Sequence, residues 1–145
     1  MDMKIAQKLI ADLVDTRQML FVINAGGAVS EMHAGESDEV QFEDNWATLE
    51  SQGWHLHMNL SEIDGAQFVE AEDAYHDFPK LYYVRFSNAD GDTLIRFYFP
   101  NPWLDENENR TDFQPEKLKL FEEFRERYVG KSGIVFVERP AQKVG

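Results

Sequence analysis

The chain has 145 residues, 43% of them hydrophobic and 13% aromatic, so it is long and apolar enough to bury one core. Its net charge of −13 repels phosphate backbones and anionic lipid surfaces, which argues against nucleic acid and membranes as partners. No apolar run approaches the roughly 20 residues that span a bilayer, and the N-terminus lacks a signal-peptide core, so we expect a cytoplasmic protein. The absence of cysteine excludes disulfides and zinc–thiolate sites.

The N-terminal third predicts a helix followed by a hairpin. Apolar residues recur at helical spacing over residues 5–14, which indicates a short amphipathic helix that covers a sheet. Two β-prone runs, 19–23 and 28–32, flank the turn signal Asn24-Ala-Gly-Gly and predict a hairpin. Residues 41–49 fit either a strand or a short helical turn.

Residues 54–60 alternate between apolar and polar side chains, which is typical of a half-buried strand. His55 and His57 therefore leave this strand on the same side. Two histidines at this spacing suit one metal ion, but no motif supplies further ligands, so ordinary polar-face residues are the simpler interpretation. His33 and His76 lie in or beside predicted loops, where a single histidine carries little information.

A second hairpin is the clearest feature of the sequence. The runs 82–87 and 93–99 flank Asp90-Gly91, a strong signal for a tight turn. With these two residues at the turn, facing positions have numbers that sum to 181. Val84 then faces Phe97 and Phe86 faces Ile95, and we expect all four side chains to be buried.

The other face of this hairpin pairs Tyr83 with Tyr98 and Arg85 with Arg96. Like charges opposite one another are unfavourable, so the two arginines need partners. In one interpretation, neighbouring acidic residues are these partners and the face is solvated. In the other, the face is a site for a planar anion, because Arg offers two parallel donors to a carboxylate and Tyr offers a flat apolar surface.

The C-terminal part predicts a helix over 115–128, with Pro115 in its first turn and an apolar stripe through Leu118, Phe121 and Phe124. A last strand over 134–137 follows, and we expect the tail 139–145 to be frayed. The pattern as a whole predicts one α+β domain, 1–145, built on an antiparallel sheet with flanking N-terminal and C-terminal helices.

Catalytic motifs are missing from the sequence. It contains no nucleophile elbow, no zincin helix, no dinucleotide fingerprint and no convincing pair of catalytic carboxylates. Because catalytic groups need not be adjacent in sequence, an enzyme is not excluded, but a binding protein is the better interpretation.

From Gly53 onward the order of features resembles the HemS/ChuX-type haem-utilisation family. The resemblance rests on Gly53-Trp-His-Leu, on the strand Ala66-Gln-Phe-Val-Glu-Ala, on the hairpin from Leu81 to Phe99, and on Gln114-Pro-Glu-Lys-Leu-Lys-Leu-Phe before the last helix. The segment 21–35 also resembles an earlier hairpin of that family. The resemblance implies a curved antiparallel sheet flanked by helices, a homodimer, and binding of haem or a related tetrapyrrole.

The same resemblance suggests candidate iron ligands. His55 stands where shorter family members carry a histidine implicated in haem binding. A second family histidine is replaced by Tyr82, which as a phenolate also ligates ferric iron, and His76 in the preceding loop is a substitute candidate. Arg96 stands where the family keeps a basic residue.

The candidate site combines the resemblance with the hairpin face. Arg85 and Arg96 are expected to hold the propionates of haem, and Tyr83 and Tyr98 to pack against the ring. The function inferred is binding of haem for its utilisation, storage or transfer. A haem-degrading enzyme and an interaction module that has lost the ligand are the alternatives.

Overall fold

The computed structural model describes residues 1–73 and 78–140. Helix α1 spans Met3–Val14, α2 spans Pro115–Tyr128, and a single turn of 3₁₀ helix, η1, spans Leu60–Glu62. The strands within these ranges are β1 (Leu20–Ala25), β2 (Ala28–His33), β3 (Glu39–Glu43), β4 (Trp46–Glu50), β5 (His55–Asn59), β6 (Gly65–Glu72), β7 (Lys80–Ser87), β8 (Thr93–Tyr98) and β9 (Val135–Arg139).

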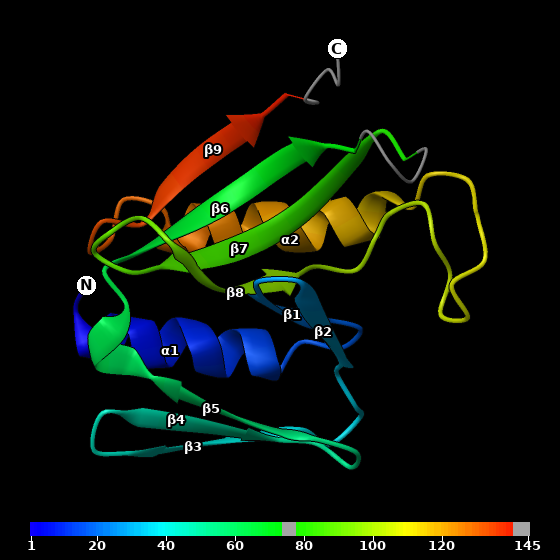
Figure 1. Ribbon diagram of the computed structural model, residues 1–145. Coiled ribbons are helices and arrows are strands. Elements are labelled where there is room, and N and C mark those ends of the chain that lie inside the picture. The colour runs from blue at the N-terminus through cyan, green and yellow to red at the C-terminus, as the bar shows by residue number, and fades with distance from the viewer. Residues whose placement is uncertain (74–77, 141–145) are drawn as a thin grey trace.

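These strands form two sheets with α1 between them (Figure 1). The large sheet has the order β2-β1-β8-β7-β6-β9, and every neighbouring pair is antiparallel except β6 and β9. The small sheet is the antiparallel set β3-β4-β5. The predicted α+β class with a mainly antiparallel sheet and flanking helices is confirmed.

Helix α2 begins where its sequence predicts, whereas α1 begins at Met3, ahead of the predicted range 5–14. The Asp2 carboxylate accepts a hydrogen bond from the Ile5 N–H and caps α1, which satisfies one of the free donors of the first turn. Pro115 opens α2, where a missing N–H costs nothing. Phe121, Phe124 and Tyr128 form the buried stripe of α2, so this helix packs through the predicted face.

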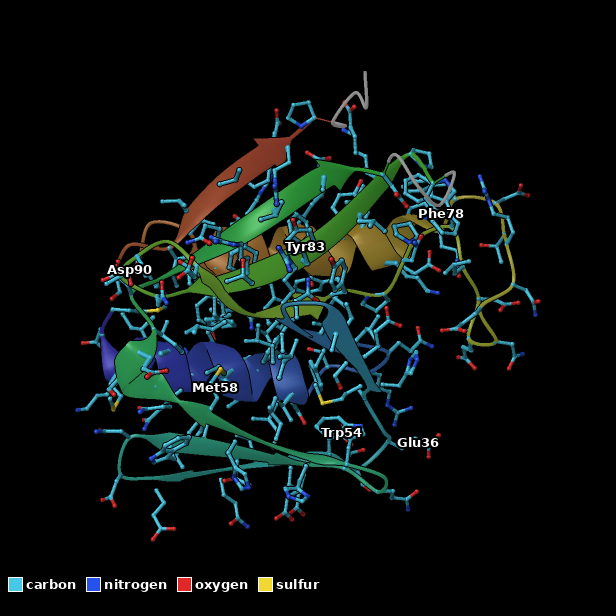
Figure 2. The ribbon with its side chains drawn as sticks, viewed as in Figure 1. Glu36, Trp54, Met58, Phe78, Tyr83 and Asp90 are labelled. Atoms are coloured by element: carbon cyan, nitrogen blue, oxygen red, sulfur yellow. The ribbon has the colours of Figure 1, made fainter. Side chains whose placement is uncertain are left out.

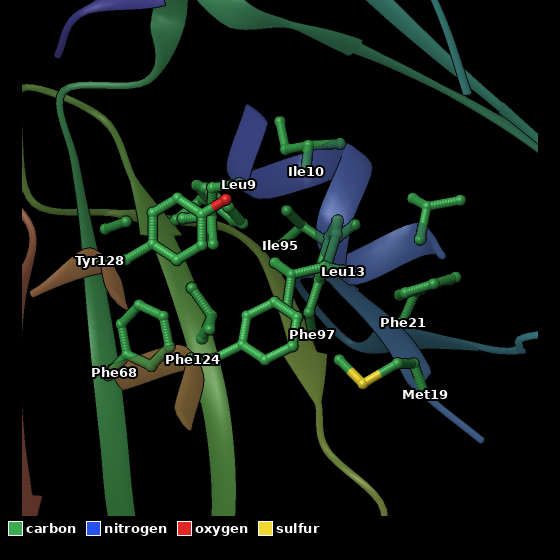
Figure 3. Close-up of a cluster of buried hydrophobic side chains, with 14 of the residues drawn as sticks. Leu9, Ile10, Leu13, Met19, Phe21, Phe68, Ile95, Phe97, Phe124 and Tyr128 are labelled. Atoms are coloured by element: carbon green, nitrogen blue, oxygen red, sulfur yellow. The ribbon is translucent and has the colours of Figure 1, made fainter. Parts of the chain in front are cut away.

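One apolar core joins both helices to one face of the large sheet, here called the inner face (Figure 3). On this face Val84, Phe86 and Phe97 are fully buried and Ile95 is 2% exposed, as the hairpin pattern predicts. Phe121 of α2 packs 5.9 Å from Phe68 between ring centroids. The core continues through α1 to Ala47 and Leu49 of the small sheet.

The structure differs from the sequence prediction in the β7–β8 connection, and it decides the conformation of the segment 41–49. The β7–β8 connection is the five-residue loop 88–92 with a register shift at Ser87, in place of a two-residue turn, although Gly91 keeps the positive φ of 84° that this loop needs. The open segment 41–49 is neither a single strand nor a helical turn: β3 ends at Glu43, and β4 starts at Trp46.

Neither helix of the described part of the chain is long and apolar enough to cross a membrane.

Candidate functional site

The face of the large sheet opposite both helices, here called the outer face, carries two cross-strand rows of side chains. The strand registers align one row as Glu31, Val22, Arg96, Arg85, Gln67 and Val135. The adjacent row is His33, Leu20, Tyr98, Tyr83, Val69 and Val137. The predicted pairing of Tyr83 with Tyr98 and of Arg85 with Arg96 is thus confirmed.

Tyr83, labelled in Figure 2, lies on the outer face between Tyr98 of β8 and Val69 of β6. The Tyr98 ring lies 4.8 Å from it between centroids, and the Arg96 guanidinium carbon lies 5.9 Å from the centroid of the Tyr83 ring. Arg139 donates a hydrogen bond of 3.2 Å to the Tyr83 hydroxyl. Tyr83 is only 4% exposed although both helices cover the inner face, because these long neighbouring side chains enclose it.

The outer face gathers three arginines, Arg85, Arg96 and Arg139. Arg85 has neutral partners: it donates to Thr93 Oγ1 at 2.6 Å, to Gln67 Oε1 at 2.7 Å and to the Gly91 carbonyl. Within residues 1–73 and 78–140, none of the three forms an ion pair with a carboxylate. The described residues thus give these arginines no direct carboxylate partner, although Glu31 stands in the same row as Arg96, with Val22 between them.

A cavity of about 560 Å³ lies beside Tyr98, where β1, β2 and β8 meet the segment 100–108. This volume falls within the range of about 300 to 1,000 Å³ that is typical of small-molecule sites. Its wall is mixed, with apolar side chains on the sheet and acidic ones on the segment. The lining residues that matter for its chemistry are Met19, Leu20, His33, Tyr98, Phe99 and Glu108.

Burial raises the pKa of Tyr98, and the neighbouring Tyr83 acts in the same direction, while Arg96 and Arg139 lower it. The phenol of Tyr98 therefore stays neutral at pH 7 and serves as a flat, polar-tipped wall between the arginines and the cavity.

Comparisons with known proteins assign the fold. A protein-family model matches residues 7–130. A crystal structure of a protein from Agrobacterium tumefaciens superposes with a TM-score of 0.67 at 18% identity, over 89% of this chain and 70% of that one. The heme-binding protein ChuX gives a TM-score of 0.61 at 10% identity, over 83% of this chain and 70% of that one.

The chain belongs to the ChuX-like family. Holo-PhuS, a heme-binding protein from Pseudomonas aeruginosa, has a TM-score of 0.52 at 14% identity, over 84% of this chain and 33% of PhuS. A search of curated proteins finds no match.

This ChuX-like chain does not bring its predicted iron ligands to the arginines. His55 is exposed on β5, and its ring lies 5.3 Å from that of His57 on the side of the small sheet that faces away from α1. Thr48 Oγ1 lies 2.9 Å from His57 Nδ1. The described residues contain no group of three or more histidines and carboxylates that is suited to hold a metal ion, so the His55–His57 pair lacks a third ligand there.

Tyr82 points to the inner face. It is 5% exposed and packs against Phe121 of α2 at 5.1 Å between ring centroids. Burial first, and then the charges of Glu70 and Glu122, raise the pKa of Tyr82 to about 12, which disfavours the phenolate that would ligate iron. His76, the substitute candidate, lies outside the described residues.

Sequence reasoning missed two residues of the outer face. Arg139 belongs to β9, although the sequence predicts that strand only over 134–137 and a frayed tail from 139. His33 ends β2, one residue beyond the predicted run 28–32, and so stands in the row of Tyr83 and Tyr98. Continuing the alternation of that run by one position would have found His33; the pairing that uses Arg139 is parallel and long-range, and leaves no local signal.

Proposed function

We propose that this ChuX-like chain binds haem or a related tetrapyrrole at the outer face and its adjoining cavity, for haem utilisation, storage or transfer. The observation that carries the proposal is the set of three arginines without carboxylate partners among the described residues, in a chain of net charge −13. Two structural neighbours, ChuX and PhuS, are described as heme-binding proteins, which supports the same ligand class.

The residues of the outer face fit the chemistry of this ligand. Haem is a flat apolar ring with two carboxylates and a central iron that takes an axial ligand. Tyr83 and Tyr98 offer aromatic surface to the ring, and guanidinium groups offer paired donors to carboxylates. The cavity of about 560 Å³ beside Tyr98 supplies a recess next to these groups.

The three arginines differ in how free their donors are. Arg96 makes its contact with the face of Tyr83, and Arg139 donates one hydrogen bond to the Tyr83 hydroxyl, so both keep N–H groups for a ligand. Arg85 already donates to three neutral acceptors and must exchange at least one of them to bind a propionate. Arg96 is therefore our first choice for a carboxylate contact, followed by Arg139 and then Arg85.

A titration of the purified chain with hemin, followed by absorbance, tests the proposal. We expect a saturable Soret change at one ligand per chain, with a dissociation constant of about 1 μM or lower. Arg96→Ala should weaken hemin binding by about tenfold or more, because a charge-assisted hydrogen bond is lost, and should leave the spectral shape unchanged.

Lys119→Ala is the matched control, since it removes one exposed positive charge from α2 on the other side of the large sheet. It should leave hemin affinity unchanged. A linear, unsaturating response of the wild-type chain would refute the proposal and favour the interaction module.

The finer expectations from the resemblance are part of the same proposal. We expect a cytoplasmic homodimer, and light scattering should then give twice the 16.8 kDa mass of the chain. His55, Tyr82 and His76 stay predicted iron ligands, and the spectra of His55→Ala, Tyr82→Phe and His76→Ala test each of them. Loss of the wild-type spectrum in one variant identifies the ligand.

A further inference from the structure

His33 is the one histidine of the described chain that stands in a row with the two tyrosines of the outer face. It pairs with Leu20, which in turn pairs with Tyr98, so two strand spacings separate His33 from Tyr98. Adjacent strands lie about 4.8 Å apart, so this separation is about 10 Å along the sheet. His33 and Tyr98 both line the cavity of about 560 Å³.

The backbone of His33 is held firmly while its side chain is open. The Trp54 indole N–H donates to the His33 carbonyl at 2.9 Å, and the next residue, Ala34, donates its N–H to the Met19 carbonyl at 2.9 Å. Trp54 itself packs edge-on against the buried Phe21 at 5.5 Å between centroids. The His33 side chain nevertheless keeps 66% of its surface exposed, so it is available to a ligand.

A carboxylate stands beside this imidazole. Glu108 Oε1 lies 3.8 Å from His33 Nε2, and both residues line the cavity. Histidines that bind metals commonly direct their second ring nitrogen to a carboxylate, which orients the ring and raises its basicity. At 3.8 Å the two atoms are too far apart for a hydrogen bond, so the contact places a carboxylate near the ring and leaves both ring nitrogens available to a ligand.

We infer that the His33 imidazole is the side chain that coordinates the central metal of the tetrapyrrole. The inference rests on the proposed function and names the metal ligand within it. His33 is favoured over His55 because it shares a face and a cavity with Tyr98, whereas His55 projects from the far side of the small sheet.

The experiment compares hemin with metal-free protoporphyrin IX, which has the same ring but no iron. A side chain that coordinates the metal affects the binding of hemin only. The wild-type chain, His33→Ala and the control His57→Ala are titrated with hemin by Soret absorbance and with metal-free protoporphyrin IX by fluorescence. In His33→Ala we expect an altered Soret band and a loss of hemin affinity of about tenfold or more, with protoporphyrin IX affinity retained. Added imidazole should restore the wild-type Soret band, and His57→Ala should match the wild type with both ligands.

The outcomes separate this inference from the proposed function. A wild-type Soret band in His33→Ala overturns the inference and leaves the proposed function standing. A change of the band in His55→Ala instead of His33→Ala also overturns it, in favour of the predicted ligand. Binding of neither hemin nor protoporphyrin IX by the wild-type chain overturns the proposed function itself. Because His33 is exposed, the thermal unfolding midpoint of His33→Ala should equal that of the wild type, which serves as the folding control.

Discussion

The two faces of the large sheet reach low solvent exposure by different means. On the inner face Phe97 is fully buried because α1 and α2 cover it with apolar side chains. On the outer face Tyr83 is 4% exposed, and its neighbours are side chains of the same sheet, namely Tyr98, Arg96 and Arg139. Removing water from the inner face stabilises the fold, whereas the outer face holds charged groups that, under the proposed function, contact the ligand.

The largest effect should follow from a cavity on the inner face. Phe97→Ala should lower the free energy of unfolding by about 3 to 5 kcal/mol, because a void adds to the lost transfer energy of a fully buried ring. Urea denaturation followed by circular dichroism measures it. The control Val29→Ala, at a position 60% exposed on β2, should change the free energy by less than about 0.5 kcal/mol, and equal effects would contradict the division into two faces.

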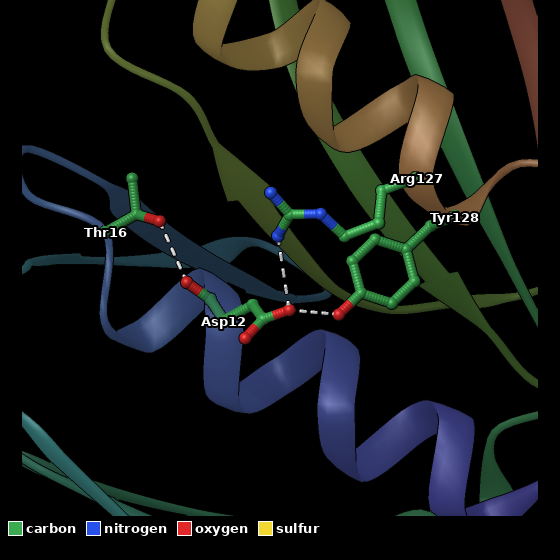
Figure 4. Close-up of polar contacts among 4 residues, drawn as sticks. All are labelled: Asp12, Thr16, Arg127 and Tyr128. Carbon is green, nitrogen blue, oxygen red and sulfur yellow. Dashed lines mark hydrogen bonds and ion pairs between the residues drawn. The ribbon is translucent and has the colours of Figure 1, made fainter.

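A smaller effect is expected where the two helices meet (Figure 4). The buried Tyr128 donates a hydrogen bond to the Asp12 carboxylate, which Arg127 also approaches at 3.5 Å. Tyr128→Phe should cost about 1 to 2 kcal/mol, at the lower end for a hydrogen bond to a charged group, because water reaches the partly exposed Asp12. A double-mutant cycle with Asp12→Ala should show coupling, and additive losses would contradict this contact.

Alkaline pH should lower the stability of the core that the helices form with the inner face. Burial and Glu70 raise the pKa of Tyr82 to about 12, and burial and Asp12 raise the pKa of Tyr128. A folded-state pKa above the unfolded value of about 10 means that these tyrosines contribute stability below pH 10 and lose it as the pH rises toward 12. Urea denaturation between pH 8 and pH 11 should therefore show declining stability, with a shallower decline in Tyr82→Phe; an identical decline would refute the assignment.

The smallest effect is expected on the outer face. Tyr83→Phe removes the acceptor for Arg139 but keeps the ring, and Arg139 regains water, so the free energy of unfolding should fall by about 0.5 to 1 kcal/mol. Thermal unfolding measures it against the wild type, with Tyr128→Phe as the reference. A loss greater than that of Tyr128→Phe would mean that the outer face contributes to stability as strongly as the helix contact.

The sequence predicts local pairing well and long-range placement poorly. The facing residues of the β7–β8 hairpin follow from alternation alone, since the pairing of Val84 with Phe97 also puts Phe86 and Ile95 on the same face. The helix of Pro115 to Tyr128 follows from its start signal and stripe. The sequence does not predict that β5 belongs to a separate sheet, because Leu56 and Met58 would alternate with polar residues in the same way in either sheet.

The candidate site shows the same limit. Alternation predicts that Tyr83, Tyr98, Arg85 and Arg96 share a face, and the strand registers confirm it. That His33 and Arg139 complete this face depends on β2 and β9, which reach it through pairings with β1 and β6. The β1–β2 hairpin is local, but the pairings of β1 with β8 and of β6 with β9 join residues far apart in the chain, where spacing gives no guidance.

The position of α1 between the sheets has a consequence for folding cooperativity. Ala47 and Leu49 of β4 belong to the same core as Leu9 and Leu13 of α1, so one helix closes the apolar faces of both sheets (Figure 1). Separation of the small sheet from the rest would expose both the apolar face of the small sheet and one side of α1. The backbone amides of β4 should thus exchange with deuterium only through opening of the whole domain, as a single foldon, and at the same free energy as those of β8.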